Sequence, residues 1–393
     1  MFYTDLPKWR LRGKALLPIV QGGMGIGISA HRLAGSVAAL GGMGTISSVE
    51  LRHHHPDLMA KLHKCRDKTA IDAANLEALD REIRGALAIS GGQGIVAVNI
   101  MRAVAEYGPY VRQSCESGAQ AIVVGAGLPL DLPDLVANYP HVALVPILSD
   151  SRGINIVLKK WQRKGRLPDA IVIEHPGWAG GHLGAARKED VNDPRFEFPT
   201  VVTETFELFK TMGIERERIP LVLAGGIDTH KKVLEALAIG AAAVQLGTPF
   251  AVCEEGDAHP NFKRVLAEAK PEDIITFTSV AGLPARAVKT PFLEGYLKKH
   301  QALIRRAKER TACTLAFDCL EVCGLRDGIA KIGQFCIALQ LAAALRGDVQ
   351  RGLFFRGAGR VPFGGTIRPV RELFDYFLNG VMPALNPEPE IVA

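Results

Sequence analysis

Short runs of apolar, often β-branched residues recur along the first two thirds of the chain, and each run ends at a glycine or a small polar residue. Nearly continuous apolar strands that alternate with helices are typical of a parallel sheet covered on both faces. The runs that fit strands are residues 15–21, 44–47, 95–99, 121–124, 142–148, 170–173, 220–224 and 242–246. The amphipathic stretches that fit helices are residues 76–87, 108–116, 154–164, 202–212 and 229–239.

Eight strands within roughly 235 residues match the size of a (β/α)8 barrel. We therefore predict an α/β protein whose residues 1–290 form a TIM barrel, with an open doubly wound sheet as the alternative. Two segments depart from the alternation: a polar insert near residues 52–75, and a helical, cysteine-bearing extension over residues 291–393. We predict that the extension is attached to the barrel rather than folded as an independent domain.

Composition and charge narrow the range of partners. The 393 residues include 47 Lys and Arg against 41 Asp and Glu, a surplus too dilute to indicate a nucleic-acid binder but suited to an anionic small molecule. No apolar stretch reaches the ~18 residues of a membrane span, and the N-terminal segment lacks the apolar core of a secretory signal. Seven cysteines, an odd number, fit a reducing compartment. We expect a cytoplasmic protein without nucleic-acid or membrane partners; whether it forms a homo-oligomer is left open.

One glycine string has the form of a dinucleotide-binding fingerprint. The G-x-G-x-x-A pattern that begins at Gly25 follows a predicted strand, and Glu50 stands about twenty residues further on. Two further glycines, Gly22 and Gly23, precede it and make the loop longer than the tight turn of that motif. We therefore disfavour dinucleotide binding at this loop.

Two other glycine-bearing loops follow the last two predicted strands. Gly225 and Gly226 come after the seventh strand, and Gly247 and Thr248 come after the eighth. In (β/α)8 enzymes these loops commonly bind phosphate, because glycines let backbone N–H groups approach its oxygens. We predict a phosphate site here, although the same glycines would also serve tight turns alone.

A histidine within a glycine-rich loop is the best candidate for catalysis. The loop from Glu174 to Gly184 follows the sixth strand and holds His182 among small residues that can lie flat against a planar ligand. Histidine can move a proton near neutral pH, and the carboxyl end of a barrel strand is where catalytic residues lie. A structural histidine is the alternative, and His175 is a weaker candidate.

Two further clusters raise the question of a metal. The run His53–His55 is disfavoured as a metal site because three adjacent imidazoles cannot point at one ion without a special turn, so a solvated loop is expected. Four cysteines lie within 24 residues, with spacings that match no standard zinc or iron–sulfur pattern. Buried thiols are favoured for them, and an irregularly spaced cluster is the alternative. These cysteines are Cys313, Cys319, Cys323 and Cys336.

The strings PIVQGGMG, VAVNIM, WAGGHLGA, LAGGI, QLGTPF and SVAGLPARAV occur in this order over residues 13–290. This combination resembles the FMN-dependent nitronate monooxygenases, formerly called 2-nitropropane dioxygenases. The same superfamily is similar to FMN-dependent enoyl-acyl-carrier-protein reductases and to NADH:quinone reductases. The resemblance implies FMN as the cofactor. The chain departs from the family pattern at two places. Relatives often carry an acidic residue at the position of Trp178 and a lysine in the region of Ser149–Ser151.

The resemblance also implies a role for individual residues. His182 would be the catalytic base or proton relay beside the flavin. Independently of the resemblance, Arg286 in the string Gly282–Arg286 is a candidate cation near the phosphate, a surface arginine being the equal alternative. The implied cofactor-binding residues are Gly22, Gly23 and Met24 at the isoalloxazine ring, Asn99 as a hydrogen-bonding partner of the flavin, Glu174, Ala179, Gly180 and Gly181 along the cofactor, and Gly225, Gly226, Gly247 and Thr248 at the phosphate, with Gln245 nearby.

Function is therefore predicted as oxidation of small alkyl nitronates by FMN and O2 to carbonyl compounds and nitrite. The alternative keeps the fold and FMN but uses NAD(P)H to reduce a quinone or an enoyl thioester. A non-catalytic sensor of a phosphate-bearing ligand is a third hypothesis, disfavoured because a sensor needs no base at His182.

Overall fold

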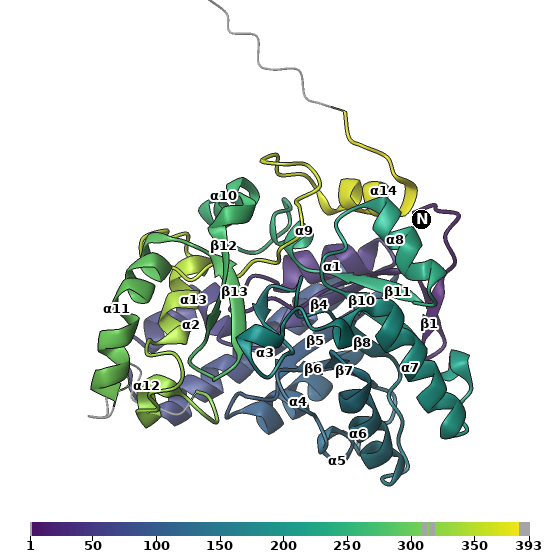
Figure 1. The fold of residues 1–393 in the computed structure, drawn as a ribbon, viewed down its shortest axis with the longest axis horizontal. Coiled ribbons are helices and arrows are strands. Elements are labelled where there is room, and N and C mark those ends of the chain that lie inside the picture. Colours follow the sequence, from purple (N-terminus) through teal and green to yellow (C-terminus); the bar gives the residue numbers. More distant parts are fainter. Residues whose placement is uncertain (1, 308–312, 314–318, 385–393) are drawn as a thin grey trace, which may run out of the picture.

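A closed barrel of eight parallel strands forms the centre of the computed structural model, which describes residues 2–307, 313 and 319–384 (Figure 1). Pairing of β11 with β3 closes the barrel. All eight predicted strand regions contribute to it, so the predicted TIM barrel is confirmed. The strands in barrel order are β3 (Ile19–Gln21), β4 (Met43–Ser47), β5 (Ile95–Met101), β6 (Ala121–Gly125), β7 (Ala143–Leu148), β8 (Ile171–Glu174), β10 (Leu221–Ala224) and β11 (Ala243–Leu246).

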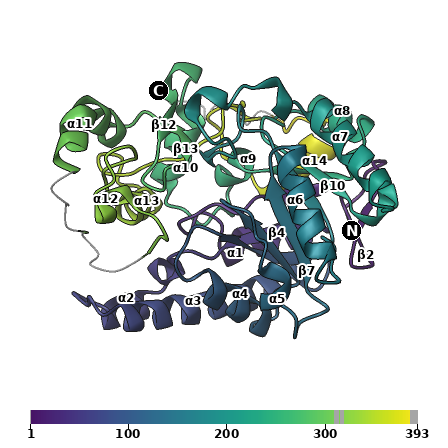
Figure 2. The ribbon, with the colours of Figure 1, turned by 60° about the horizontal axis from the view of Figure 1, so that its bottom comes forward.

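Helices cover the outside of the barrel, as the alternation along the sequence predicts (Figure 2). The apolar residues of each strand alternate between the barrel interior and the helix layer, and both sets are buried. The outer helices are α1 (His31–Ala39), α3 (Lys68–Ser90), α4 (Tyr107–Glu116), α5 (Leu132–Leu135), α6 (Ser151–Gln162), α7 (Phe198–Thr211) and α8 (His230–Ala238).

The first predicted strand is divided into two. Its beginning pairs in a hairpin of β1 (Trp9–Leu11) with β2 (Lys14–Leu16), and only its end, after Pro18, enters the barrel as β3. Proline carries no backbone N–H and therefore interrupts the strand. Trp9, Leu11 and Leu16 pack against the interior residues of the barrel strands, so the hairpin closes the amino-terminal end of the barrel.

The polar insert is largely helical, so the expectation of a loop is wrong, although most of its residues are partly or fully exposed to solvent. After β4 the chain forms a 3-10 helix (Leu51–His54) and α2 (Pro56–Lys61), and residues 68–75 are the first turns of the long helix α3. Glu50, Arg52 and Asn75 are buried, with Arg52 2.6 Å from the Glu50 carboxylate and Asn75 donating to it at 3.1 Å. These polar side chains satisfy one another, which is why they can be buried although most of the insert is partly or fully exposed.

The C-terminal segments pack on two sides of the barrel (Figures 1 and 2). Helices α11 (Pro291–Ala307), α12 (Gly324–Asp327) and α13 (Ile337–Leu345) lie on one side, and α14 (Val370–Asn379) contacts α1 and α8 on the other. Before them the chain forms α9 (Thr248–Ala251), α10 (Pro260–Glu268), and β12 (Ile274–Thr278) and β13 (Pro284–Val288), which make a small sheet with β9 (Gly181–His182). The buried residues Phe335, Leu353 and Phe374 belong to the same core as the barrel helices.

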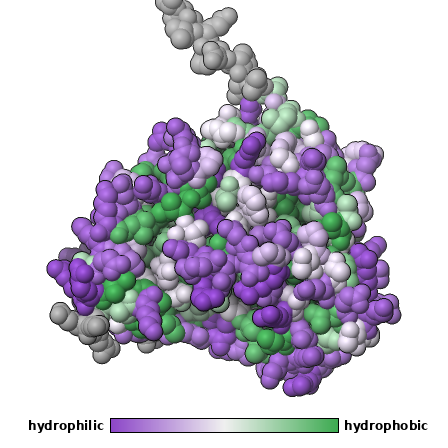
Figure 3. Space-filling view, viewed as in Figure 1, coloured by the Kyte–Doolittle hydropathy of each residue, from purple (hydrophilic) through white to green (hydrophobic). Residues whose placement is uncertain are grey.

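The surface and the helices show where apolar residues gather. On the face in Figure 3, hydrophobic residues form small areas separated by hydrophilic ones. Within the described ranges, no helix is both long and apolar enough to cross a bilayer.

Candidate active site

A cavity opens at the carboxyl ends of the barrel strands, the position of active sites in this fold. Its volume is about 300 Å³, at the lower end of the ~300–1,000 Å³ typical of a small-molecule site. The structure brings all fourteen predicted site residues to its wall: Gly22, Gly23, Met24, Asn99, Glu174, Ala179, Gly180, Gly181, His182, Gly225, Gly226, Gln245, Gly247 and Thr248.

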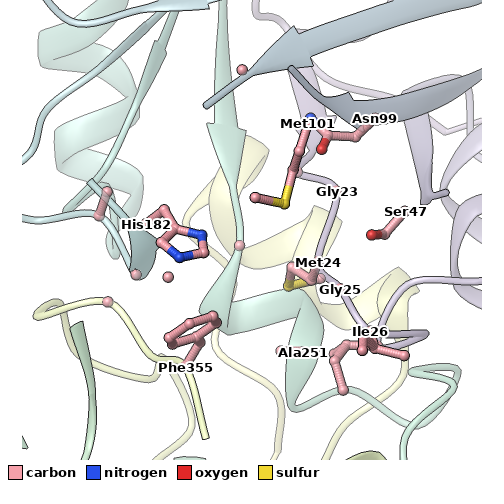
Figure 4. A pocket seen from close by; sticks show the side chains of 18 of the residues that line it. Gly23, Met24, Gly25, Ile26, Ser47, Asn99, Met101, His182, Ala251 and Phe355 are labelled. Carbon is pink, nitrogen blue, oxygen red and sulfur yellow. The ribbon is translucent and has the colours of Figure 1, made fainter. Parts of the chain in front are cut away.

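The loop after β3 forms one wall, and its glycines are required by close neighbours (Figure 4). A Cβ atom on Gly23 would lie 2.2 Å from the Asn99 Cβ, and one on Gly25 would lie 2.7 Å from the Ser47 hydroxyl oxygen. Real side chains do not approach so closely. The loop therefore passes directly beside Asn99, whose amide is available to a ligand in the cavity.

The loops after β10 and β11 form the predicted phosphate region. Gly226 has a φ of +73°, a backbone conformation suited to glycine. In the described part of the chain, the N–H groups of Gly226 and Gly247 donate to no protein acceptor. A Cβ on Gly247 would meet only the Met24 sulfur, at 4.0 Å. This open, N–H-bearing cradle fits the oxygens of a phosphate group.

His182 is held by strand pairing. It lies on β9, which pairs with β13 so that His182 stands opposite Ala285. Its Nε2 atom lies 3.0 Å from the Ser279 hydroxyl oxygen. Its ring packs edge-on against that of Phe355, with 5.5 Å between the ring centroids. Burial lowers the pKa of His182 to about 4, so the imidazole is neutral near pH 7 and can accept a proton.

Glu174 ends β8 and presents a carboxyl group to the same cavity. Burial raises its pKa to about 7, and the positive charge of Arg286 opposes this rise. Arg286 is 5% exposed, so the surface-arginine alternative is wrong. Its guanidinium donates to the carbonyl of Pro176 at 3.0 Å and to that of Ala179, and therefore holds the loop that leads to His182. Arg286 is not among the residues of the cavity wall.

His175 points away from the cavity. It is 3% exposed, and its Nδ1 atom accepts a hydrogen bond from the Gly177 N–H at 3.0 Å. Its Nε2 atom lies 3.6 Å from the Glu197 carboxylate. Because His175 is absent from the cavity wall, it shapes the loop and does not reach a ligand in the cavity.

A segment that the sequence reasoning missed completes the wall. Phe355, Arg356, Gly357, Gly359 and Arg360 come from the C-terminal region and face the β10 and β11 loops. The Gly357 N–H donates to the Thr248 hydroxyl at 3.1 Å, and Arg356 is buried, donating to the Leu266 carbonyl at 2.8 Å. The R-G-x-G-R pattern was the available signal, because glycines flanked by arginines often mark an anion site.

Beyond these loops the cavity wall includes further polar and apolar side chains. The polar ones include Ser47, Glu50, Asp72, Asn75, Glu106, Tyr110 and Cys319. The apolar ones include Ile26, Ile28, Val49, Ala251, Phe262, Leu266, Ile337, Ala338, Leu341, Ala344 and Leu353. Most of these apolar residues belong to one hydrophobic cluster, to which α10 and α13 contribute.

The three histidines of the run have separate partners, whereas cysteines of the C-terminal group lie near one another. His53 lies 3.5 Å from Glu50, His54 lies 2.7 Å from the Gly27 carbonyl oxygen, and His55 lies 2.9 Å from Glu82, so the imidazoles do not converge. Burial, together with the nearness of the other three cysteines of the C-terminal group, raises the pKa of Cys319 to about 12. Over the described ranges, no three His, Cys, Asp or Glu side chains are arranged to hold a metal ion.

Comparison with solved structures gives the same architecture. FabK from Thermotoga maritima aligns with a TM-score of 0.65 and 22% identity, covering 92% of this chain and 91% of that one. A nitroalkane oxidase from Streptomyces ansochromogenes aligns with a TM-score of 0.61 and 20% identity, covering 92% and 94%. At these identities the likeness establishes the shared fold.

Sequence comparison identifies the family. A probable nitronate monooxygenase of Bacillus subtilis is 37% identical over 76 residues, 19% of this chain and 22% of the relative. One of Staphylococcus saprophyticus is 28% identical over 128 residues, 31% of this chain and 33% of the relative. These matches span a third or less of the relatives' length. The sequence model described as nitronate monooxygenase matches residues 10–377, nearly the whole chain. The chain therefore belongs to the nitronate monooxygenase family.

Proposed function

We propose that the protein is an FMN-dependent oxidoreductase that oxidises alkyl nitronates with O2 to carbonyl compounds and nitrite. The observation that carries this proposal is the position of His182, a neutral imidazole held at the cavity wall among loops whose glycines leave space for a planar ligand. Family membership supports the same reaction.

The cavity fits FMN. Gly226 and Gly247 offer unpaired N–H groups for the phosphate, and Asn99 offers an amide to the ring system. Arg360, exposed at the rim beside these loops, adds a positive charge near the phosphate region. When bound, FMN supplies the redox chemistry, and the protein supplies binding, orientation and proton transfer.

His182 would handle the substrate proton. With its Nε2–H donating to Ser279, the lone pair on Nδ1 is available to take the α-proton of a neutral nitroalkane. Ser279 also accepts a hydrogen bond from the Ala281 N–H at 3.3 Å, which fixes its hydroxyl. The negative charge of the resulting nitronate would then stabilise the protonated imidazole beside it.

The second candidate is an NAD(P)H-dependent flavin reductase acting on a quinone or an enoyl thioester. The apolar side chains of α10 and α13 on the cavity wall favour it, because a quinone or an enoyl thioester offers them more apolar surface than a small nitronate does. Both functions place the reacting carbon at His182, so the cavity geometry is compatible with either.

Anaerobic stopped-flow absorbance distinguishes the two functions. The flavin-loaded protein is mixed separately with propyl-2-nitronate and with NADH or NADPH. Reduction of the flavin by the nitronate, followed by nitrite formation when air is admitted, is the expected result. Reduction by the nucleotide alone would assign the protein to the reductase class, and a preparation that binds no FMN would contradict both functions.

A further inference from the structure

We propose that Cys313, Cys319, Cys323 and Cys336 bind an iron–sulfur cluster beside the cavity. The proposal goes beyond the proposed function and does not depend on it, because iron and sulfide are measured chemically. Backbone contacts place three of these cysteines, and the fourth is close enough to affect the Cys319 thiol.

Hydrogen bonds fix Cys319 to the barrel. The Ala105 N–H donates to the Cys319 carbonyl at 3.3 Å, and the Glu321 N–H donates to the Ala103 carbonyl at 2.9 Å. Residues 103–105 follow β5, so this pairing holds Cys319 at the carboxyl end of the barrel. Cys319 and Leu320 line the cavity. A group bound by Cys319 therefore lies at the cavity wall.

A tight loop brings the next two cysteines together. Cys323 directly precedes Gly324, and Cys336 follows Gly333 by three residues. A Cβ atom on Gly324 would lie 2.2 Å from the Gly333 carbonyl oxygen, so the two backbones are in contact. The Gln334 side chain closes the loop by donating to the Gly324 carbonyl at 3.1 Å. Cys323 and Cys336 therefore stand at the two ends of one closed loop.

The segment that supports His182 also anchors this loop. The Gly324 N–H donates to the Val280 carbonyl at 2.8 Å, and the Gly333 N–H donates to the Ser279 carbonyl at 2.9 Å. The Ser279 hydroxyl oxygen lies 3.0 Å from His182 Nε2. The cysteine loop is therefore held in a fixed position next to the proposed reaction centre.

The four thiols are close enough to influence one another. Cys323 is buried, and Cys319 and Cys336 pack against the main core. Burial and the nearby Cys323, Cys336 and Cys313 raise the pKa of Cys319 to about 12. The buried Cys115 differs, because its pKa is raised by burial and by a glutamate rather than by other thiols. Grouped thiolates are stabilised when a metal centre supplies positive charge among them.

An iron–sulfur cluster fits these thiols better than a single metal ion does. Ligand sulfurs of a zinc ion all lie ~2.3 Å from one point, and among the described residues no three side chains are arranged to hold one ion. Four cysteines are the usual ligand set of an iron–sulfur cluster. In a four-iron cluster each thiolate binds a different iron, so the sulfurs stand farther apart. Because loop contacts bring the thiols together, their spacing along the sequence need not follow a short motif.

The position of the site gives the cluster a use. Cys319 lines the cavity, and so does Ile337, which directly follows Cys336. An iron–sulfur cluster here can therefore exchange single electrons with a redox cofactor in the cavity. For each electron that passes, one of the two centres is oxidised and the other reduced, and no further reactant is needed.

Metal and sulfide analysis tests the proposal. The full chain is purified without oxygen and incubated with ferrous iron and sulfide, and excess reagent is then removed. We expect iron and acid-labile sulfide in equal amounts, about two or four of each per chain. Reduction with dithionite should produce a low-temperature EPR signal that a flavin radical does not give. A folded protein that holds no iron and no sulfide, or that holds one zinc ion instead, would overturn the proposal.

Variants test which thiols bind the cluster. Cys323→Ala should lower iron and sulfide at least about tenfold, because one of the four ligands is lost. Cys319→Ser, a smaller change, gives the same test if far-UV circular dichroism shows that Cys323→Ala is unfolded. Cys115→Ala is the matched control, since Cys115 is also buried, and it should keep the full content. Equal iron and sulfide in Cys323→Ala, Cys319→Ser and the unmodified protein would overturn the assignment of these ligands.

Discussion

At Gly23 the backbone passes so close to Asn99 that a single methyl group cannot be accommodated. We expect Gly23→Ala to displace either the loop or Asn99, and so to lower FMN occupancy, measured as the ratio of flavin to protein absorbance, by at least about tenfold. Gly295→Ala is the control, because a Cβ on Gly295 meets nothing within 4 Å and alanine favours the helix. Full occupancy in Gly23→Ala would show that flavin does not bind against this loop.

His182 is the residue on which the proposed chemistry depends. His182→Ala should retain FMN and lose turnover of neutral nitroalkanes by about 10²–10⁴-fold, the usual contribution of a general base. Turnover of preformed nitronates should fall less, because their proton has already been removed. Steady-state assays with both forms of one substrate measure the difference. Unchanged activity with the neutral form would remove His182 from the role of base.

At the scale of elements, the loop between β8 and β9 depends on Arg286. Arg286→Met would leave the carbonyls of Pro176 and Ala179 without their donor, at a cost of about 1–3 kcal/mol. We expect a lower unfolding midpoint and a reduced kcat, because the loop positions His182. Denaturant unfolding and steady-state kinetics measure both. Arg264→Met, on the exposed side of α10, is the control and should change neither.

Local features explain how much of this arrangement could be predicted. The eight strands and the glycine loops at their ends are encoded in short runs, such as residues 220–226, and the structure confirms the barrel. The burial of Arg52 and Asn75 within the insert could not be predicted, because their polar groups are satisfied by contacts with Glu50 and with each other. Phe355 reaches the cavity from far along the chain. Such tertiary contacts leave no periodic signal in the sequence.

For the whole molecule, stability should depend on pH through two cavity residues with opposite effects. The pKa of Glu174 is raised to about 7, so between pH 4.5 and 7 the folded protein holds a proton that the unfolded chain has released. The free energy of unfolding therefore falls as pH rises through this window, by up to about 3 kcal/mol. The pKa of His182 is lowered to about 4, so its contribution to the free energy of unfolding rises between pH 4 and 6.5.

Denaturant unfolding of the flavin-free protein from pH 4 to 8 measures both contributions. Relative to the unmodified protein, Glu174→Gln should gain stability as pH rises, because glutamine cannot ionise. His182→Gln should lose stability relative to the unmodified protein as the pH rises from 4 to 6.5. Over this range the unmodified protein gains stability because its unfolded chain releases the imidazole proton, and glutamine has no such proton. If the difference in free energy of unfolding from the unmodified protein changed with pH in the same direction for both variants, burial would not set both pKa values. Parallel curves for all three proteins would show that neither group titrates in the cavity, and His182 would then lose the buried, neutral state on which its role as a base depends.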